Sequence, residues 1–241
     1  MKRLSLLALA IVILFTSCGG NLFGKRVRGD GHITTETRAV TGYTSIDVSG
    51  AIDVYVKQDS TQHISIETDQ NLMPYIVVRE EGGVLKIYPK DNSNLKPTGT
   101  IKVYVSGSNF KRFEASGACD YYSENKISNT ESISIDMSGP SDATMELNAP
   151  KITAEVTGAG KLTLKGETKD LNVSGTGSSD LKCFGMQAEN VDVDITGAGD
   201  AEVFASVKLD VSVSGAGNVR YKGNASVNQK VSGAGSVKKA E

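Results

Sequence analysis

Val156-Thr157-Gly158-Ala159-Gly160 is one of several nearly identical stretches that divide this sequence into short units. Close copies are Val173-Ser174-Gly175-Thr176-Gly177, Ile195-Thr196-Gly197-Ala198-Gly199, Val213-Ser214-Gly215-Ala216-Gly217 and Val231-Ser232-Gly233-Ala234-Gly235. Looser copies are Val48-Ser49-Gly50-Ala51, Ala115-Ser116-Gly117-Ala118 and Met137-Ser138-Gly139-Pro140. From Gly117 onward, the first glycines of successive copies are 17 to 22 residues apart. Such a short period is typical of a stacked array, in which each unit buries its apolar face against its neighbours.

The residues in front of each glycine predict what kind of unit is stacked. The positions two and four residues before the glycine are apolar in every copy except at Gln229, and the positions between them are polar. Alternation of period two with many β-branched residues predicts half-buried β-strands, and helical spacing is absent. Each strand then ends at a Ser/Thr-Gly corner, where glycine adopts positive φ without a steric penalty.

These features predict an all-β protein whose fold is a right-handed parallel β-helix, or solenoid, with a strand-rich N-terminal capping half. A unit of this length holds two or three short strands with their turns, and successive coils stack about 4.8 Å apart. The right-handed sense follows from the handedness of β-crossover-β connections. An antiparallel sandwich or barrel with glycine turns is the alternative, but identical turn chemistry in every unit favours stacking.

The first residues of the chain predict secretion and a lipid anchor. Lys2 and Arg3 precede a short apolar run from Leu4 to Phe15, which is typical of a signal peptide over residues 1–17. The run Leu14-Phe15-Thr16-Ser17-Cys18-Gly19 resembles the lipobox of bacterial lipoproteins, which makes Cys18 the predicted site of lipid attachment. A plain signal peptide with a chance cysteine is the alternative. The predicted location is the cell envelope, with the protein anchored by its lipid in the outer membrane.

The mature chain divides into three predicted regions. Residues 18–37 have no apolar period, which predicts a flexible tether, and the tripeptide Arg28-Gly29-Asp30 within it, which integrins bind, is interpreted as solvated linker. Residues 38–113 are expected to form the strand-rich N-terminal half that caps the stack, and residues 114–241 the repeat solenoid. Candidate strands in the N-terminal half are residues 45–48, 52–57, 63–68, 76–79, 84–88 and 101–105.

Several stretches together resemble a known family. They are Gly-Tyr-Thr-Ser-Ile-Asp-Val-Ser-Gly-Ala-Ile-Asp-Val-Tyr-Val at 42–56, Gly-Gly-Val-Leu-Lys-Ile at 82–87, the lipobox, and the tandem Ser-Gly-Ala-Gly units. The combination resembles the DUF2807 family, described as auto-transporter adhesins with a head GIN domain and common in Bacteroidota envelopes. The resemblance covers about residues 38–235. It implies a β-helical fold and an envelope location, and it brings no catalytic or binding residues to carry over.

The sequence contains no motif for a cofactor or for catalysis. A net charge of −2 with mixed signs leaves no basic footprint for nucleic acid. Gly158-Ala159-Gly160 lacks the third glycine and the following helix of a dinucleotide loop, and no Gly-x-Ser-x-Gly elbow is present. Two histidines far apart do not make a His-based metal site. We therefore expect a protein without a cofactor that is not an enzyme.

Acidic residues recur at fixed distances from the glycines. Glu114, Asp136 and Glu155 each stand three residues before one, so that stacking would align them in an outward column about 4.8 Å apart. Such a column is a hypothesis for a Ca²⁺ site, and a solvated polar face is the simpler interpretation. A second set stands three residues after the glycine at Asp120, Asp142 and Asp200, with Asp180 shifted by an insertion.

The predicted function is that of a lipid-anchored envelope protein that presents a rigid β-solenoid face, as an adhesin or as a scaffold. Its predicted partners are the membrane, through the N-terminal lipid, and an envelope glycan or a surface protein. One alternative is a pectinase-like enzyme acting on polysaccharide, which would require a cleft with two facing carboxylates and an arginine. The other is a purely structural envelope lipoprotein. Cys119 and Cys183 lie three coil intervals apart, which predicts two free thiols.

Overall fold

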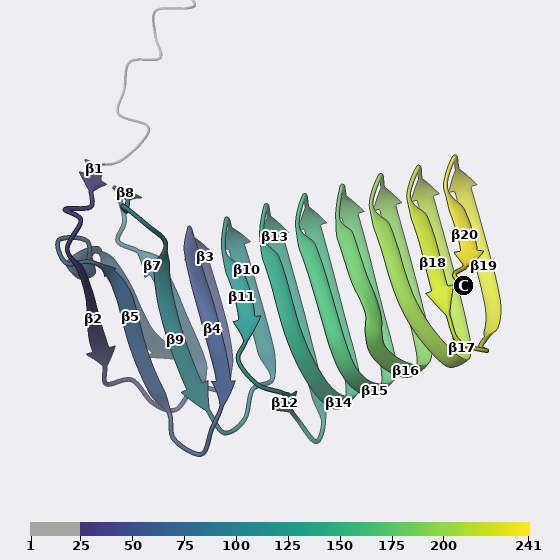
Figure 1. The fold of residues 1–241 in the computed structure, drawn as a ribbon, viewed down its shortest axis with the longest axis horizontal. Coiled ribbons are helices and arrows are strands. Elements are labelled where there is room, and N and C mark those ends of the chain that lie inside the picture. Colours follow the sequence, from purple (N-terminus) through teal and green to yellow (C-terminus); the bar gives the residue numbers. More distant parts are fainter. Residues whose placement is uncertain (1–24) are drawn as a thin grey trace, which may run out of the picture.

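The computed structural model describes residues 25–241, which are mostly β-strand with very little helix (Figure 1). The predicted signal peptide and Cys18 lie outside the described residues. The strands are β1 Lys25–Arg28, β2 Ile33–Arg38, β3 Ser45–Gly50, β4 Ile52–Gln58, β5 His63–Asp69, β6 Ile76–Glu81, β7 Val84–Pro89, β8 Ser93–Lys96, β9 Ile101–Gly107, β10 Arg112–Gly117, β11 Asp120–Ser123, β12 Ile127–Ser128, β13 Ser132–Gly139, β14 Asp142–Gly158, β15 Lys161–Gly177, β16 Asp180–Gly197, β17 Asp200–Gly215, β18 Asn218–Lys222, β19 Ser226–Gly233 and β20 Ser236–Lys239. A short 3-10 helix, η1, spans Met73–Tyr75. Within residues 25–241, no helix has the length and apolar character needed to cross a membrane.

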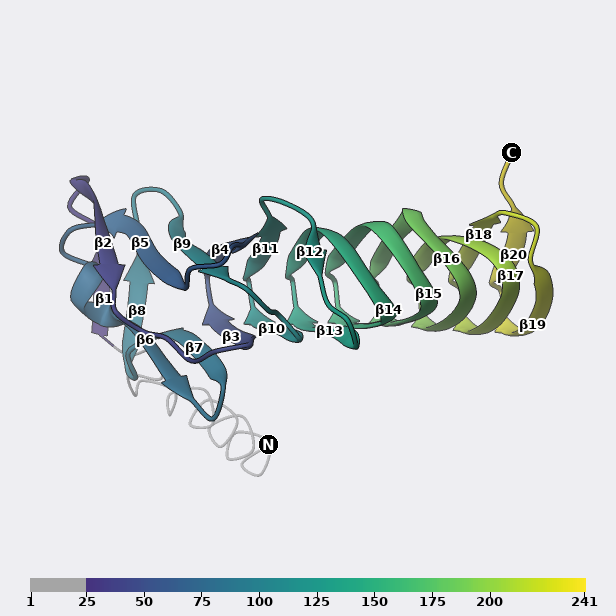
Figure 2. The same cartoon turned by 90° about the horizontal axis from the view of Figure 1, so that it is seen from below.

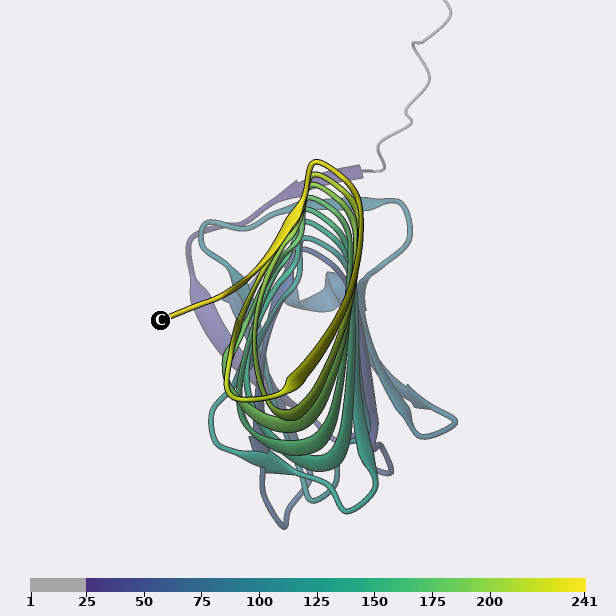
Figure 3. The ribbon, with the colours of Figure 1, turned by 90° about the vertical axis from the view of Figure 1, so that its right-hand side faces the viewer.

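Each rung of the fold consists of one strand that rises to a glycine corner and one that returns from it (Figure 1). The rising strands form the ascending sheet: β7, β3, β10, β13, the second halves of β14 to β17, and β19. The returning strands form the descending sheet: β9, β4, β11, the first halves of β14 to β17, β18 and β20. All of these rung-to-rung pairings are parallel. In Figure 3, which faces the C-terminal end, the chain turns counterclockwise as it advances toward the viewer, so the coil is right-handed.

The corner glycines stack directly on one another and fix the register. They are Gly50, Gly117, Gly139, Gly158, Gly177, Gly197, Gly215 and Gly233, all with φ between 94° and 129°. The sequence interpretation that placed Gly175 at a corner is wrong, because Gly158 and Gly197 both pair with Gly177. Gly175 lies two residues earlier, at an inward position opposite Val156 and Ile195. With this register, the spacing of the repeats is more even than the sequence indicated.

The core fills the narrow space between the two sheets along the whole stack. Inward side chains at the predicted alternating positions are buried, and the largest of them lie in the N-terminal rungs: Tyr43, Phe110, Phe113 and Tyr121. Aromatic contacts join Phe113 to Phe110 and to Tyr121, with ring centroids 5.7 Å apart in both pairs. Toward the C-terminal end the inward columns contain smaller residues, chiefly Val, Leu, Ile and Ala. Burial of continuous apolar columns therefore holds the rungs together.

The N-terminal end is closed by antiparallel strands, but the region from 38 to 113, which was expected to form a capping half, is not a separate cap. β5 pairs antiparallel with β9, β2 pairs antiparallel with β5, and β6 forms a hairpin with β7 that projects from this end (Figure 2). β3 and β4 belong to the stack itself and lie between the β7–β9 rung and the β10–β11 rung. The predicted boundary at residue 113 is therefore not a structural boundary.

The predicted tether over residues 18–37 is also too long, because residues 25–28 and 33–38 form β1 and β2. A buried carboxylate fixes the turn between these strands. Asp69 accepts hydrogen bonds from the Gly31 amide at 2.8 Å, the Thr98 amide at 2.9 Å and the Thr98 hydroxyl at 2.8 Å. Asn71 binds the backbone on both sides of Gly29, through Arg28 O and Asp30 N. The Arg28-Gly29-Asp30 tripeptide is consequently part of a fixed turn.

Both described cysteines are free and buried, as predicted. Burial raises the pKa of Cys119 to about 11 and that of Cys183 to about 12. Their side chains fill inward positions of the core, in the manner of small apolar residues.

Candidate functional site

The outer face of the descending sheet carries two neighbouring columns of side chains that run along the solenoid axis. We call this surface the ladder face. The column nearer the corners contains Lys102, Asp53, Asp120, Asp142, Lys161, Asp180, Asp200, Asn218 and Ser236. The next column contains Tyr104, Tyr55, Tyr122, Thr144, Thr163, Lys182, Glu202, Arg220 and Lys238. The two columns place charged and hydroxyl groups at the rung repeat over the length of the molecule.

Three stacked tyrosines form the N-terminal part of this face. The ring centroids of Tyr104 and Tyr55 are 5.0 Å apart, and those of Tyr55 and Tyr122 are 5.1 Å apart, with the planes tilted by about 22°. The next residue along the column is Thr144, whose side chain is small, so the outer surface of the Tyr122 ring is not covered by another ring in the column. We call Tyr104, Tyr55 and Tyr122 the tyrosine ladder.

The polar ends of the tyrosine ladder lie beside carboxylates. The Tyr122 hydroxyl donates to Asp120 Oδ2 at 3.2 Å. Burial, with the negative charge of Asp120, raises the pKa of Tyr122 to about 12. Burial and the neighbouring Asp120 raise the pKa of Asp53, while Lys102 opposes the shift. Lys102 Nζ forms a salt bridge of 2.9 Å with Glu67 on β5. This region therefore combines aromatic surface with hydroxyl, carboxylate and ammonium groups.

The carboxylates of the first column bind the backbone of the next rung. Oδ1 of Asp120 accepts from the amide of Asp142 at 2.9 Å, and Oδ1 of Asp142 accepts from the amide of Lys161 at 3.0 Å. Oδ1 of Asp200 accepts from the amide of Asn218 at 2.9 Å in the same way. Asp180 is in register with the others and is not shifted, because its corner residue is Gly177. This acidic set therefore satisfies strand amides at the corners.

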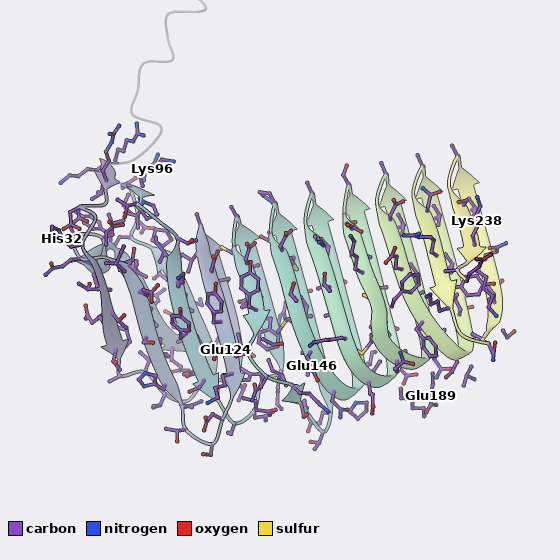
Figure 4. The ribbon with its side chains drawn as sticks, in the orientation of Figure 1. His32, Lys96, Glu124, Glu146, Glu189 and Lys238 are labelled. Atoms are coloured by element: carbon purple, nitrogen blue, oxygen red, sulfur yellow. The ribbon has the colours of Figure 1, made fainter. Side chains whose placement is uncertain are left out.

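A groove of about 620 Å³ lies on the ladder face near its C-terminal end, where Figure 4 labels Lys238. Its lining carries charges of both signs, and several of them pair with one another. Lys182 lies 3.3 Å from Asp180, and Arg220 forms a salt bridge with Glu202. Asp200 is already engaged with Asn218. The carboxylates of this groove thus lie side by side on one sheet and do not face each other across a cleft.

The predicted acidic column lies on the opposite, ascending sheet. Glu114 is in register with Asp136, and Asp136 with Glu155, so the predicted alignment is confirmed. Arg112 forms salt bridges with both Glu114 and Asp136, the latter at 3.0 Å. Within residues 25–241, no group of three or more His, Cys, Asp or Glu side chains is arranged as metal ligands. Arg112 therefore supplies the positive charge that the Ca²⁺ hypothesis assigned to a metal ion.

The sequence interpretation missed the tyrosine ladder. Tyr55 stands five residues after Gly50, and Tyr122 stands five residues after Gly117, so the two share one offset from their corners. That offset predicts adjacent rings once the glycines are aligned. Tyr104 follows no corner glycine, and its place in the column is set by the pairing of β9 with β4.

The comparisons with known proteins agree with this architecture. A family model described as "putative auto-transporter adhesin, head GIN domain" matches residues 42–225.

The chain belongs to the DUF2807 family.

Solved structures similar to this DUF2807 chain come from Bacteroidales. A protein described as a putative adhesin from Bacteroides fragilis NCTC 9343 has a TM-score of 0.84 at 19% identity, covering 89% of this chain and 100% of its own. A putative adhesin from Parabacteroides distasonis ATCC 8503 has a TM-score of 0.71 at 28% identity, covering 90% and 100%. A protein from the same organism described as a putative lipid binding protein has a TM-score of 0.73 at 24% identity, with the same coverage. No curated protein matches the chain.

Proposed function

We propose that this DUF2807 protein is a lipid-anchored envelope protein, without enzymatic activity, that binds an extended glycan along its ladder face. The observation that carries this proposal is the tyrosine ladder at one end of a continuous double column of polar side chains. A sugar ring has an apolar C–H surface and a polar hydroxyl edge. Tyrosine rings and neighbouring polar groups complement those two surfaces together.

The arrangement of charges supports binding over polysaccharide cleavage. Hydrolysis by the usual pair of carboxyl groups needs them on opposite sides of the scissile bond. On the ladder face they lie in one column, and Asp120, Asp142 and Asp200 are engaged with strand amides. The family description and the similar structures described as putative adhesins also support a binding role.

The binding proposal is tested by screening the chain from Gly19 onward against an array of bacterial and host glycans. Tyr55→Ala with Tyr122→Ala should weaken binding of a recognised glycan by about tenfold or more, because aromatic anchors dominate such contacts. Thr157→Ala with Thr196→Ala, two exposed positions on the ascending sheet, is the matched control and should bind normally. Unchanged binding by the tyrosine variant would contradict the assignment of the ladder face. If the chain bound surface proteins and no glycan, the partner would be a protein and the glycan proposal would be wrong.

The anchoring part of the proposal rests on Cys18 and has its own test. Cys18→Ser should move the protein from the membrane fraction to the soluble fraction, because the attached acyl chains provide the stable membrane affinity. A Cys18→Ser protein that stays in the membrane fraction and is processed normally would contradict lipid attachment at this residue.

A further inference from the structure

The N-terminal end of the described structure carries a dense group of basic residues. β1 contributes Lys25, Arg26 and Arg28, and the paired strand β8 and the turn before it contribute Lys96 and Lys90. All five side chains are exposed, and we call them the basic patch. Over residues 25–28 and 90–96 the only acidic residue is Asp91, although the whole chain has a net charge of −2. Positive charge is therefore concentrated at one end of a weakly acidic protein.

No ion pair with another residue of the described range 25–241 neutralises the basic patch. Among residues 25–241, none of its five members forms a salt bridge, whereas the arginines elsewhere in that range all do: Arg38, Arg79, Arg112 and Arg220. Residues 1–24 contain no Asp or Glu, so the start of the chain has no carboxylate side chain to offer. Arg28 and Lys96 are moreover direct neighbours across the two strands. Two positive charges side by side repel each other, and an anion placed against them lowers that repulsion.

The basic patch lies where the chain enters the described structure. Lys25 is seven residues after Cys18. Seven residues of fully extended chain span about 25 Å at most. Figure 4 labels Lys96 at this end, whereas Lys238 marks the opposite end of the solenoid. A lipid attached at Cys18 would therefore hold the basic patch close to the membrane surface.

We propose that the basic patch docks on the anionic lipid headgroups of the membrane that holds the lipid anchor. This inference rests on the proposed anchoring at Cys18. Basic residues next to an anionic surface each add to membrane affinity, and the attraction acts within about a Debye length, roughly 10 Å at 0.1 M salt. Docking of the N-terminal end would fix one end of the solenoid at the membrane and leave the distant rungs of the ladder face to contact a partner.

The test uses the chain from Gly19 onward, which contains the entire described core from Tyr43 to Val219 and carries no lipid. Its sedimentation with phosphatidylcholine vesicles is compared with its sedimentation with mixed phosphatidylcholine and phosphatidylglycerol vesicles. We expect binding only to the mixed vesicles, and loss of that binding at 1 M salt, where the Debye length is about 3 Å. Arg26→Gln, Arg28→Gln and Lys96→Gln together should weaken it on the order of a hundredfold, which is about fivefold per residue.

A matched control removes three exposed lysines that form no salt bridge within residues 25–241 and lie outside both the basic patch and the ladder face: Lys151→Gln, Lys169→Gln and Lys230→Gln. It lowers the net charge equally and should bind like the unmodified chain. Equal loss in both triple variants would overturn the proposal, because net charge alone would then explain binding. Binding to a DNA duplex without binding to anionic vesicles would overturn it as well. Because this chain carries no lipid, a failure here is separate from a failure of lipid attachment at Cys18.

Discussion

At the scale of single residues, the core tolerates a missing side chain at Gly175 because of its neighbour Ser179. A Cβ atom on Gly175 would clash with the buried Ser179 Oγ, which has no hydrogen-bond partner among the described residues. One rung earlier the same two positions are occupied by Val156 and Gly160, the reverse combination. In each of these two rungs, a larger residue at one position is therefore matched by glycine at the other.

We predict that Gly175→Val destabilises the protein by about 1–3 kcal/mol, the usual cost of overpacking a filled core. Adding Ser179→Gly should recover most of this loss, because the double variant reproduces the Val156–Gly160 pair of the preceding rung. Urea unfolding of the two single variants and the double variant measures the coupling. If the changes in the free energy of unfolding were simply additive, the presence of glycine at 175 would not be explained by Ser179.

The stability of the turn between β1 and β2 depends on pH through Asp69. Burial raises the pKa of this carboxyl, but hydrogen bonds from Thr98 and Gly31 outweigh burial and hold the pKa below its usual value. Stability from such a group is present above the unfolded pKa of about 3.9 and is lost as the pH falls through the folded value.

We therefore predict that Asp69→Asn lowers the free energy of unfolding by about 1–3 kcal/mol at neutral pH, since it removes the charge from a buried acceptor that binds Gly31 and Thr98. The difference from the unmodified protein should shrink as the pH falls below about 4, because the contribution of Asp69 is lost between its unfolded pKa and its lower folded pKa. Thermal unfolding between pH 3 and pH 7 measures both effects. A difference that stays constant over this range would show that the charge of Asp69 contributes nothing.

At the scale of elements, the glycine corner controls how closely two rungs approach. At Gly197 the φ angle is 117°, and an added Cβ would lie 2.5 Å from the carbonyl oxygen of Gly177 in the preceding rung. Two constraints therefore act on one residue: a backbone conformation that L side chains rarely adopt, and contact with the neighbouring backbone.

Gly197→Ala should destabilise the protein by about 3 kcal/mol or more, from backbone strain together with the clash. Gly82→Ala is the control, because Gly82 has a φ of 62° but no atom within 4 Å of an added Cβ. The control should cost only about 1 kcal/mol. Equal losses in urea unfolding would mean that conformation alone, and not the approach of the rungs, requires glycine at the corner.

The elements also show what the sequence could and could not predict. The six candidate strands from 45 to 105 are all present, because apolar alternation reflects burial on one side of a sheet. The register at Gly175 was wrong because Gly175 and Gly177 offer the same local signal, and only contact with Gly158 and Gly197 selects between them. β1 and β2 were missed because they pair with β8 and β5, which lie far along the chain. The tyrosine ladder likewise depends on the pairing of β9 with β4.

At the scale of the whole molecule, the last described rung differs from the rungs it stacks on. Gln229 replaces Val211 and Lys239 replaces Tyr221 at equivalent positions of the register. An apolar edge strand readily pairs with another chain, and charged or polar side chains prevent this. The exception in the repeat pattern at Gln229 therefore has a structural explanation.

We predict that Gln229→Val with Lys239→Tyr makes the protein self-associate, because the last rung would then present the same apolar surface as an interior rung. Sedimentation velocity over a range of protein concentrations should show dimers or larger species for this variant. The control is Lys230→Val with Lys238→Tyr, which introduces the same two residue types at exposed positions of the same two strands. Monomeric behaviour of the first variant would mean that other features keep this edge unpaired.

The position of β3 and β4 in the stack determines the order in which the protein can be assembled. Ile46 pairs with Leu85 on one side and with Phe113 on the other, so the first rung in the sequence acquires both neighbours only after much more chain has been made. Later rungs each join a neighbour only about 20 residues back, which is a short loop to close. The segment up to β9 thus acts as a seed, and the rest of the chain is added to it in one direction. A chain that emerges N-terminus first, as it does during synthesis, can therefore add each new rung to a completed template.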